Sequence, residues 1–196
     1  MGHKFAEIAF TPNVKKAQEL NGSRKSYARM EGGEAHHDVI GPNEAGFISE
    51  RDSFYMATVS ETGWPYIQHR GGPPGFIRVL DATTIGFADF RGNRQYVSVG
   101  NLENDDRVAL ILMDYPNRAR LKILGRARLI GLDDPDTLQR LSLPDYRTVV
   151  ESAVIIRVEA FDWNCSQHIT PRFTLAEIDG ATAPLRQRIA ELETAP

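Results

Sequence analysis

The chain has 196 residues, a formal net charge of −3 and 41% hydrophobic residues, a composition typical of one globular domain with short appendages. The negative charge argues against bulk nucleic-acid binding, and no apolar run approaches the ~20 residues that span a bilayer. The N-terminus lacks the apolar segment of a signal peptide, and the single cysteine, Cys165, excludes an internal disulfide framework. We therefore expect a cytoplasmic protein with neither nucleic-acid nor membrane partners.

Residues 1–50 are predicted to form a helical extension. Thr11 is a good N-cap and Pro12 suits the first helical position, so a helix is expected over residues 12–30. A polar, glycine-rich connection over residues 31–42 and a short helix over residues 43–50 complete this extension.

Beyond residue 51 the hydrophobic period changes to two, which is typical of strands. Strands are predicted over residues 53–60, 66–70, 76–80, 84–90, 107–115, 118–131 and 152–164. The strand over 107–115 is apolar on both faces, which indicates a central position. Six or seven antiparallel strands with few helices favour a mainly β fold, a small barrel rather than a sandwich. We expect the barrel over residues 51–175 and a C-terminal helix within residues 176–196, amphipathic over 185–192. A further helix is predicted over 133–143.

Residues 86–102 combine a strand, a tight turn and a helix start, with arginine at the turn. Gly92 permits a positive φ, and Asn93 is a good N-cap, which would put Arg94 in the first helical turn. A cation there opposes the helix dipole, unless a phosphate is held by the free N–H groups and the guanidinium. The alternative is an ordinary capped turn with a solvated arginine.

Arginine outnumbers lysine by 18 to 5, and nine of the arginines lie between Arg70 and Arg128. In the strand over 118–131, alternate residues face opposite sides, so one face is apolar. The other face carries five cations, interrupted by Leu124: Arg118, Arg120, Lys122, Arg126 and Arg128. Repulsion makes such a row costly unless anions or carboxylates face it. Either an anionic ligand lies along this strand, or the strand is an exposed edge protected by charge.

These features, in this order, resemble the pyridoxamine 5'-phosphate oxidase family of FMN-binding split barrels over roughly residues 53–172. The matching motifs are Arg78-Val79-Leu80 on a strand, Asn93-Arg94-Gln95 at the turn, Asn104-Asp105 before an apolar strand, Arg120 five residues before Gly125, and Trp163 with Arg172. Taken without the resemblance, Arg78 is a cation in an apolar strand that either faces outward or needs a buried partner.

The resemblance implies FMN bound at a homodimer interface. Arg78 and Arg94 would hold the phosphate, Arg120 would approach the flavin ring, and Lys122 is a second candidate for the ring. Trp163 and Arg172 would come from the partner subunit. The full expected cofactor-binding set is Arg78, Val79, Leu80, Asp89, Phe90, Asn93, Arg94, Gln95, Arg120, Lys122, Trp163, Gln167, His168 and Arg172.

Three departures from the family pattern stand out. Gln95 replaces the usual lysine after the turn arginine, and Asp89-Phe90 stands where many members carry Tyr-Thr. Arg172-Phe173-Thr174 replaces the C-terminal Arg-x-His pattern of the vitamin B6 enzyme. The chain is therefore expected to belong to the broad related group and not to be the vitamin B6 oxidase itself.

The segment 163–172 gathers reactive side chains at a strand's end. His168 is the catalytic candidate, as a donor to the flavin or an acid–base group, and otherwise a surface residue. Cys165 is either a packing residue or a redox thiol. His36 and His37 are adjacent, which suits solvated loop residues better than metal ligands, and no residues have zinc spacing, so no metal site is expected.

The function expected from these residues and the resemblance is an FMN-dependent oxidoreductase acting on a small molecule or NAD(P)H. The alternative is a non-catalytic module that holds a flavin, haem or a deazaflavin on the same barrel. A third possibility makes the cationic strand a protein-interaction edge.

Overall fold

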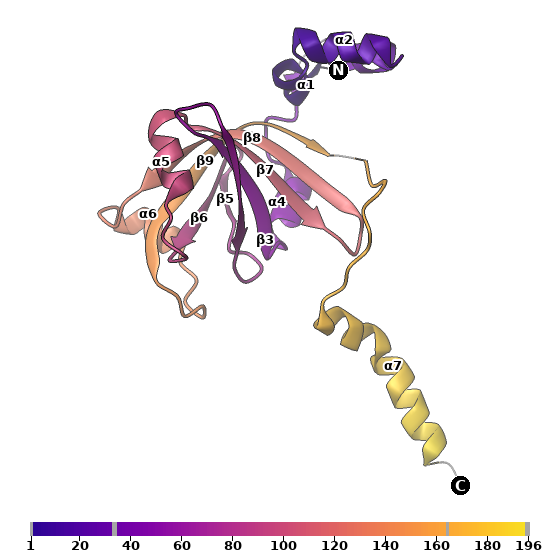
Figure 1. Cartoon of the computed structure of the whole chain (residues 1–196). Helices are drawn as coiled ribbons and strands as arrows, with labels where there is room; N and C mark the ends of the chain where they lie inside the picture. The colour runs from indigo at the N-terminus through magenta and orange to yellow at the C-terminus, as the bar shows by residue number, and fades with distance from the viewer. Residues whose placement is uncertain (1, 33–34, 164, 195–196) are drawn as a thin grey trace.

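Seven antiparallel strands form one strongly curved sheet in the order β4-β3-β7-β8-β9-β6-β5 (Figure 1). The strands are β3 (Ser53–Val59), β4 (Pro65–Gly71), β5 (Arg78–Asp81), β6 (Thr84–Phe90), β7 (Arg107–Asp114), β8 (Ala119–Ile130) and β9 (Val150–Trp163). The computed structural model describes residues 2–32, 35–163 and 165–194. Positions 33, 34 and 164, within the predicted connection and last strand, lie outside these residues. The predicted antiparallel split barrel is confirmed.

The core lies on the concave side of this sheet because alternate residues of each strand point inward. Phe54 of β3, Leu112 of β7 and Leu121 of β8 are each almost completely buried. β7 lies between β3 and β8, so its predicted central position is confirmed. Its outward residues Ile111 and Met113 are only half-buried, and they lie on the convex face of the sheet.

At the split of the barrel the edge strand β4 meets β6, the last strand but one at the opposite end of the sheet. β4 and β6 are not hydrogen-bonded neighbours, yet an ion pair between Arg70 of β4 and Asp89 of β6 joins them. Helix α5 (Val97–Asn104) packs beside this junction, where the hydroxyl of Ser98 donates to Gln68 at 3.0 Å. The split is therefore closed by polar contacts between side chains rather than by a strand ladder.

The N-terminal extension is more broken than predicted. The expected helix over 12–30 divides into α2 (Pro12–Leu20), α3 (Arg24–Tyr27) and the 3₁₀ turn η1 (Ala28–Met30), because Gly22 takes a positive φ of 73° after the first segment. The Thr11 cap is confirmed, since its hydroxyl accepts from the Val14 N–H. Helix α4 (Pro42–Ser49) matches the predicted short helix within one residue. A helix α1 (Lys4–Ala9) and a parallel pair of β1 (Gly2–His3) with β2 (Ala35–His36) were not predicted.

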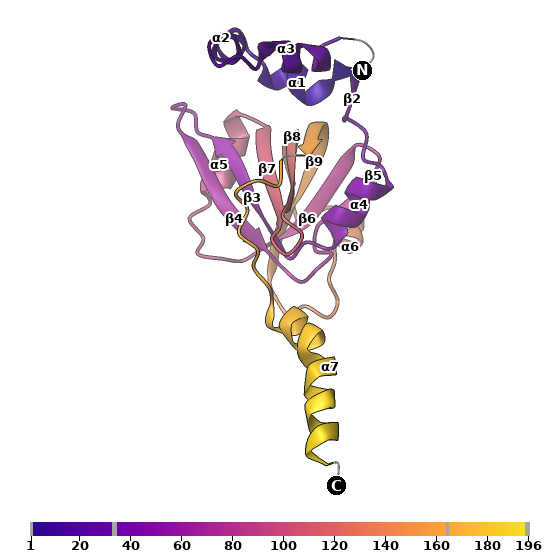
Figure 2. The same ribbon diagram turned by 90° about the vertical axis from the view of Figure 1, so that its right-hand side faces the viewer.

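The C-terminal helix is longer than expected. Residues 185–192 are only its second half, because α7 runs from Leu175 to Glu193. Thr174 and Glu177 form a capping box at its start, and Gly180 and Pro184 lie inside it. Helix α6 (Pro135–Arg140) lies within its predicted range. In the views of Figures 1 and 2, α1 and α2 lie at one end of the barrel, and α7 extends away from the other. In the described part of the chain, no helix has both the length and the apolar character of a membrane span.

Candidate functional site

A polar cleft lies at the split of the barrel, where β4, the end of β6 and the start of α5 meet. A cavity of about 50 Å³ there is lined by Gln68, Arg70, Asp89, Phe90, Gly92, Asn93, Arg94, Tyr96, Ser98, Val99 and Glu151. A second cavity of about 140 Å³ adjoins it and shares Arg70, Asp89 and Phe90. The cleft therefore unites four predicted site residues, Asp89, Phe90, Asn93 and Arg94, with residues that sequence reasoning did not select.

The turn before α5 differs from the prediction. Arg94 and Tyr96 have positive φ angles of 61° and 53°, and the helix begins only at Val97. Asn93 is therefore not the helix N-cap; its side chain instead accepts the Gln95 N–H at 3.1 Å within the turn. Left-handed residues inside a turn are the backbone form found in anion-binding nests. Arg94 therefore lies in the turn that precedes the helix and not in its first turn, and its role in holding a phosphate stays a prediction.

Arg94 is exposed at the mouth of the cleft. Its Nε donates to the Tyr96 hydroxyl at 3.1 Å, and that hydroxyl in turn contacts the Glu151 carboxylate at 3.3 Å. Glu151 also accepts from Arg91 at 2.7 Å. Within the described residues, the two terminal nitrogens of Arg94 have no hydrogen-bond partner, so they are available to an anion.

Arg70 is the functional candidate that sequence reasoning missed. Its side chain and that of Asp89 are each 13% exposed, and its buried Nε has no hydrogen-bond partner in the described structure. Burial raises the pKa of Asp89, against the opposing effect of the Arg70 charge. The alternation of β4 could have identified Arg70 as an inward-facing residue, because it shares its face with Tyr66 and Gln68 and not with the exposed Ile67.

Arg78 lies apart from this cleft. It begins the edge strand β5 and pairs with Gly86, in the first half of β6, whereas Arg94 follows the end of β6. Its neighbour Val79 packs on the main core, and Leu80 packs on a smaller cluster beneath α6. β5 and β6 pair in order as expected, but this pairing does not bring Arg78 and Arg94 into one cavity. The role of Arg78 stays a prediction.

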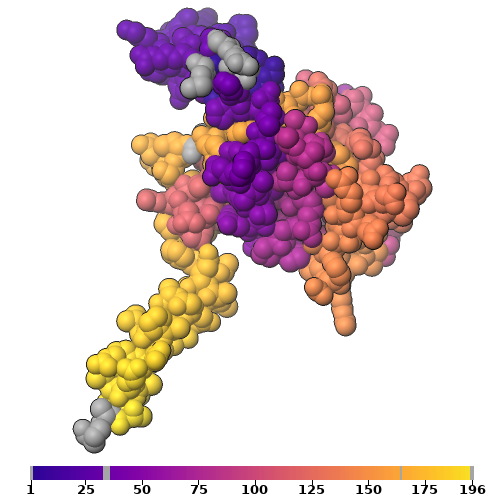
Figure 3. Space-filling model, turned by 180° about the vertical axis from the view of Figure 1, so that it is seen from behind, coloured from indigo at the N-terminus to yellow at the C-terminus, as the bar shows by residue number. Residues whose placement is uncertain are grey.

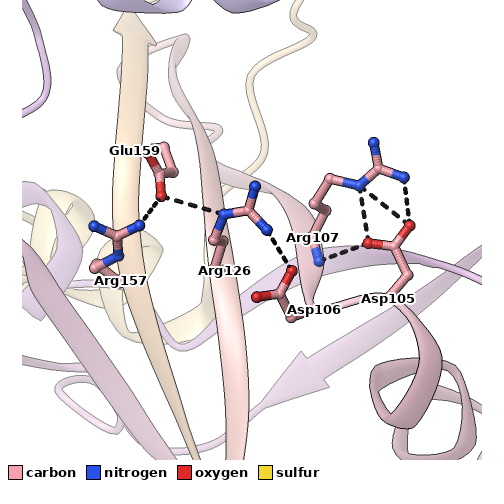
Figure 4. Close-up of polar contacts among 6 residues, drawn as sticks. All are labelled: Asp105, Asp106, Arg107, Arg126, Arg157 and Glu159. Atoms are coloured by element: carbon pink, nitrogen blue, oxygen red, sulfur yellow. Dashed lines mark hydrogen bonds and ion pairs between the residues drawn. The ribbon is translucent and has the colours of Figure 1, made fainter.

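The cationic strand meets carboxylates. The predicted alternation of β8 is confirmed, but β8 lies between β7 and β9, so its interpretation as an exposed edge is wrong. Arg126 pairs with Asp106 at 2.6 Å and with Glu159 at 3.4 Å (Figure 4). Its cross-strand neighbour Arg157 shares Glu159 with it, whereas Arg107, its neighbour on the other side, forms a separate pair with Asp105. Arg118 precedes the strand, with a positive φ of 53°.

The two residues predicted to contact the flavin ring lie near the start of β8. Lys122 pairs with Asp162 at 2.8 Å, and its ammonium lies 4.6 Å from the centre of the Phe5 ring of α1. Arg120 is half-buried opposite Met113 of β7. Neither residue lines the cleft of Arg94, so their assignment to a flavin ring stays a prediction.

The C-terminal candidates also lie elsewhere. The Trp163 indole donates to Glu44 at 2.8 Å, and Arg172 lies 4.8 Å from the centre of the Tyr115 ring. His168 is exposed with a positive φ of 63°, and the Gln167 N–H donates to the Cys165 sulfur. Cys165 is exposed, so its interpretation as a buried packing residue is wrong. In the described chain these residues do not line the cleft at the split.

The sequence matches the family model described as pyridoxamine 5'-phosphate oxidase over residues 40–164. A structure from Lactobacillus delbrueckii described as a pyridoxamine 5'-phosphate oxidase is 18% identical, with a TM-score of 0.50, and covers 64% of this chain and 94% of its own. HupZ from Group A Streptococcus is 18% identical, with a TM-score of 0.49 and coverages of 64% and 99%.

An F420 reductase is 15% identical, with a TM-score of 0.45 and coverages of 63% and 98%. A search of curated proteins finds no significant match. At these identities the solved structures establish the fold alone, and the family assignment rests on the match of the family model to most of the chain. The chain therefore belongs to the pyridoxamine 5'-phosphate oxidase family and folds as one of its split barrels.

Proposed function

We propose that this protein binds FMN and transfers hydride or electrons between that flavin and a small molecule or NAD(P)H. The observation that carries the proposal is the pair of arginines, Arg70 and Arg94, on one cleft at the split of the barrel. The family includes flavin- and deazaflavin-binding oxidoreductases, which supports a flavin as the ligand. Bound FMN supplies the hydride and electron transfer, while the protein supplies binding and electrostatics.

The donors in the cleft fit a phosphate. Arg94 offers two terminal nitrogens, and Arg70 has a buried Nε without a partner in the described structure. Two carboxylates oppose an anion, but Asp89 is matched by Arg70 and Glu151 by Arg91. The local balance is three arginines against two carboxylates, which leaves one positive charge for the ligand.

The cavity beside Arg94, at about 50 Å³, has room for a phosphate and not for a flavin ring. We infer that the ring lies outside it, against a face completed by a second subunit. Arg120 and Lys122 are the candidates to stabilise negative charge on the reduced ring, and Trp163 and Arg172 the candidates supplied by the partner. His168 stays the candidate acid–base residue.

A homodimer is supported by the convex face of the sheet. Tyr55 of β3 and Ile67 of β4 are 39% and 62% exposed, and Tyr55 lies directly opposite Ile111 of β7 in the ladder. Met113 continues the apolar surface on β7. Contiguous apolar side chains on a sheet face indicate an interface with another protein surface.

The test is the absorbance spectrum of the purified protein with and without added FMN. We expect flavin uptake and, in the Arg94→Ala variant, a loss of affinity of about 10-fold or more. The matched control is Arg128→Ala, which removes a β8 arginine that does not line the cleft. No uptake at micromolar FMN, or equal losses in the two variants, would contradict the proposal. Bound FMN that NAD(P)H does not reduce and that passes electrons to no acceptor would favour the non-catalytic alternative.

A further inference from the structure

Helix α7 presents an apolar stripe that nothing in the described chain covers. The helix has 19 residues, all of them described, and none is buried. Leu175, Leu185, Ile189 and Leu192 are 80%, 65%, 55% and 59% exposed, and Ile178 is 44% exposed. Figure 3 shows the helix standing away from the barrel with its sides open.

The stripe has the spacing of a helix–helix seam. Its residues follow one another at alternating intervals of three and four: Leu175, Ile178, Thr182, Leu185, Ile189 and Leu192. This is the a and d pattern of a heptad repeat, in which each side chain packs between residues of a facing helix. Gly180 and Pro184 occupy positions on the outer side, where they do not obstruct a partner helix.

The helix needs that partner for its stability. An isolated helix of this length is marginal in water, and Gly and Pro in its interior both disfavour the helical form. The capping box at Thr174 offsets only part of this. Packing of the apolar stripe against a partner is therefore the interaction that stabilises α7 as a helix.

We propose that the stripe of α7 pairs with α7 of a second copy of this chain, in antiparallel orientation. A two-fold axis between Thr182 and Leu185 places Leu175 against Leu192 of the partner subunit, and Ile178 against Ile189 of the partner subunit. Asp179 and Arg186 lie beside the stripe and form an ion pair with each other at 3.1 Å within the chain, so the same neutral pair of a second copy can lie against them without repulsion.

The charges of α7 also argue against a membrane surface as the occupant. Glu177, Asp179, Glu191 and Glu193 outnumber Arg186 and Arg188, whereas helices that bind membrane surfaces carry a basic polar face. The contact is separate from the flavin cleft, so its test does not depend on flavin binding.

Cysteine cross-linking of the full chain identifies the occupant. In a Cys165→Ser background, Leu175→Cys with Leu192→Cys is expected to give a disulfide-linked dimer on mild oxidation, with peptides 175 and 192 joined between chains. The control pair, Ala176→Cys with Ala190→Cys, lies on the outer side of the same helix and is expected to stay monomeric on a denaturing gel. Absence of a covalent dimer in the first pair overturns the proposal.

Hydrogen exchange tests the same contact without a cross-link. Amides of residues 179–192 are expected to exchange at least ~10-fold more slowly in the wild type than in a Leu185→Asp, Ile189→Asp variant, with the barrel unchanged. Gln187→Asp, on the outer side, is expected to keep the protection. Unprotected α7 amides in the wild type, or protection retained in the stripe variant, would overturn the pairing.

Discussion

The cleft at the barrel split and the cationic strand β8 are both rich in arginine, but they differ in whether carboxylates of the chain pair with the guanidinium groups. On β8, Arg126 meets Asp106 and Glu159 and Lys122 meets Asp162, so carboxylates of the protein pair with these two cations. In the cleft, the terminal nitrogens of Arg94 have no partner in the described structure, and Arg70 has a buried unpaired Nε. A row of cations therefore locates a charged face, whereas the pairing of each guanidinium decides whether that face needs a ligand.

The largest effect is expected for the stability of the cleft itself. Arg70→Ala leaves the buried Asp89 carboxylate without its partner, so the free energy of unfolding should fall by about 3 kcal/mol. Denaturant titration measures this. The corresponding β8 change, Arg126→Ala, breaks a half-exposed pair and should cost at most about 1 kcal/mol. Losses of similar size in the two variants would contradict the difference between the two regions. As a control, Asp89→Asn in the Arg70→Ala background should restore part of the stability.

The second-largest effect is expected on ligand affinity, which should depend on the arginines of the cleft and not on those of β8. Arg94 is exposed and supports no core packing, so Arg94→Ala should leave the free energy of unfolding within about 0.5 kcal/mol of the wild type. Its loss should instead weaken FMN binding by about 10- to 100-fold, because hydrogen bonds to charged groups contribute about 1.5–3 kcal/mol. Flavin fluorescence titration measures both Arg94→Ala and Arg128→Ala. A large stability loss with unchanged affinity would show that Arg94 is structural.

Added salt should weaken the stabilisation from the β8 ion pairs more than that from the buried Arg70–Asp89 pair. Glu159→Gln removes the carboxylate shared by Arg126 and Arg157 and should cost at most about 1 kcal/mol at low salt. The cost should shrink in 1 M salt, where the Debye length is about 3 Å. Unfolding midpoints at the two salt concentrations test this. A cost that does not change with salt would mean that the network is shielded from solvent.

The smallest effect is expected from pH, at the Asp105–Arg107 pair beside this network. Hydrogen bonds from Arg107 lower the pKa of Asp105 from 3.8 to about 2. Because the folded-state pKa is the lower one, the contribution of Asp105 to stability is present above pH 3.8 and is lost as the pH falls through about 2. Asp105→Asn should therefore flatten the pH dependence of unfolding in that window. An unchanged curve would show that the contact contributes nothing in solution.

Local periodicity predicted most of the fold and one side of the site. The alternation of Leu121 and Ile123 with Lys122 placed β8 and its faces correctly, and the Gly92–Arg94 turn located the cleft. The sequence did not reveal Arg70, because its importance comes from the closure of the barrel onto Asp89, a contact between strands that are not neighbours in the sheet. The amphipathic pattern predicted over residues 185–192 covers only the second half of α7, because the helix starts at the Thr174–Glu177 capping box, which lies outside that pattern.

We propose that the cleft of Arg70 and Arg94 holds the phosphate of FMN. The most direct measurement compares the dissociation constants of FMN and riboflavin, which differ only in that phosphate, for the wild type and for Arg94→Ala. We predict that the wild type binds FMN at least about 10-fold more tightly than riboflavin, and that Arg94→Ala removes most of this preference. Equal affinities of the wild type for the two flavins, or a preference that Arg94→Ala leaves intact, would contradict the claim.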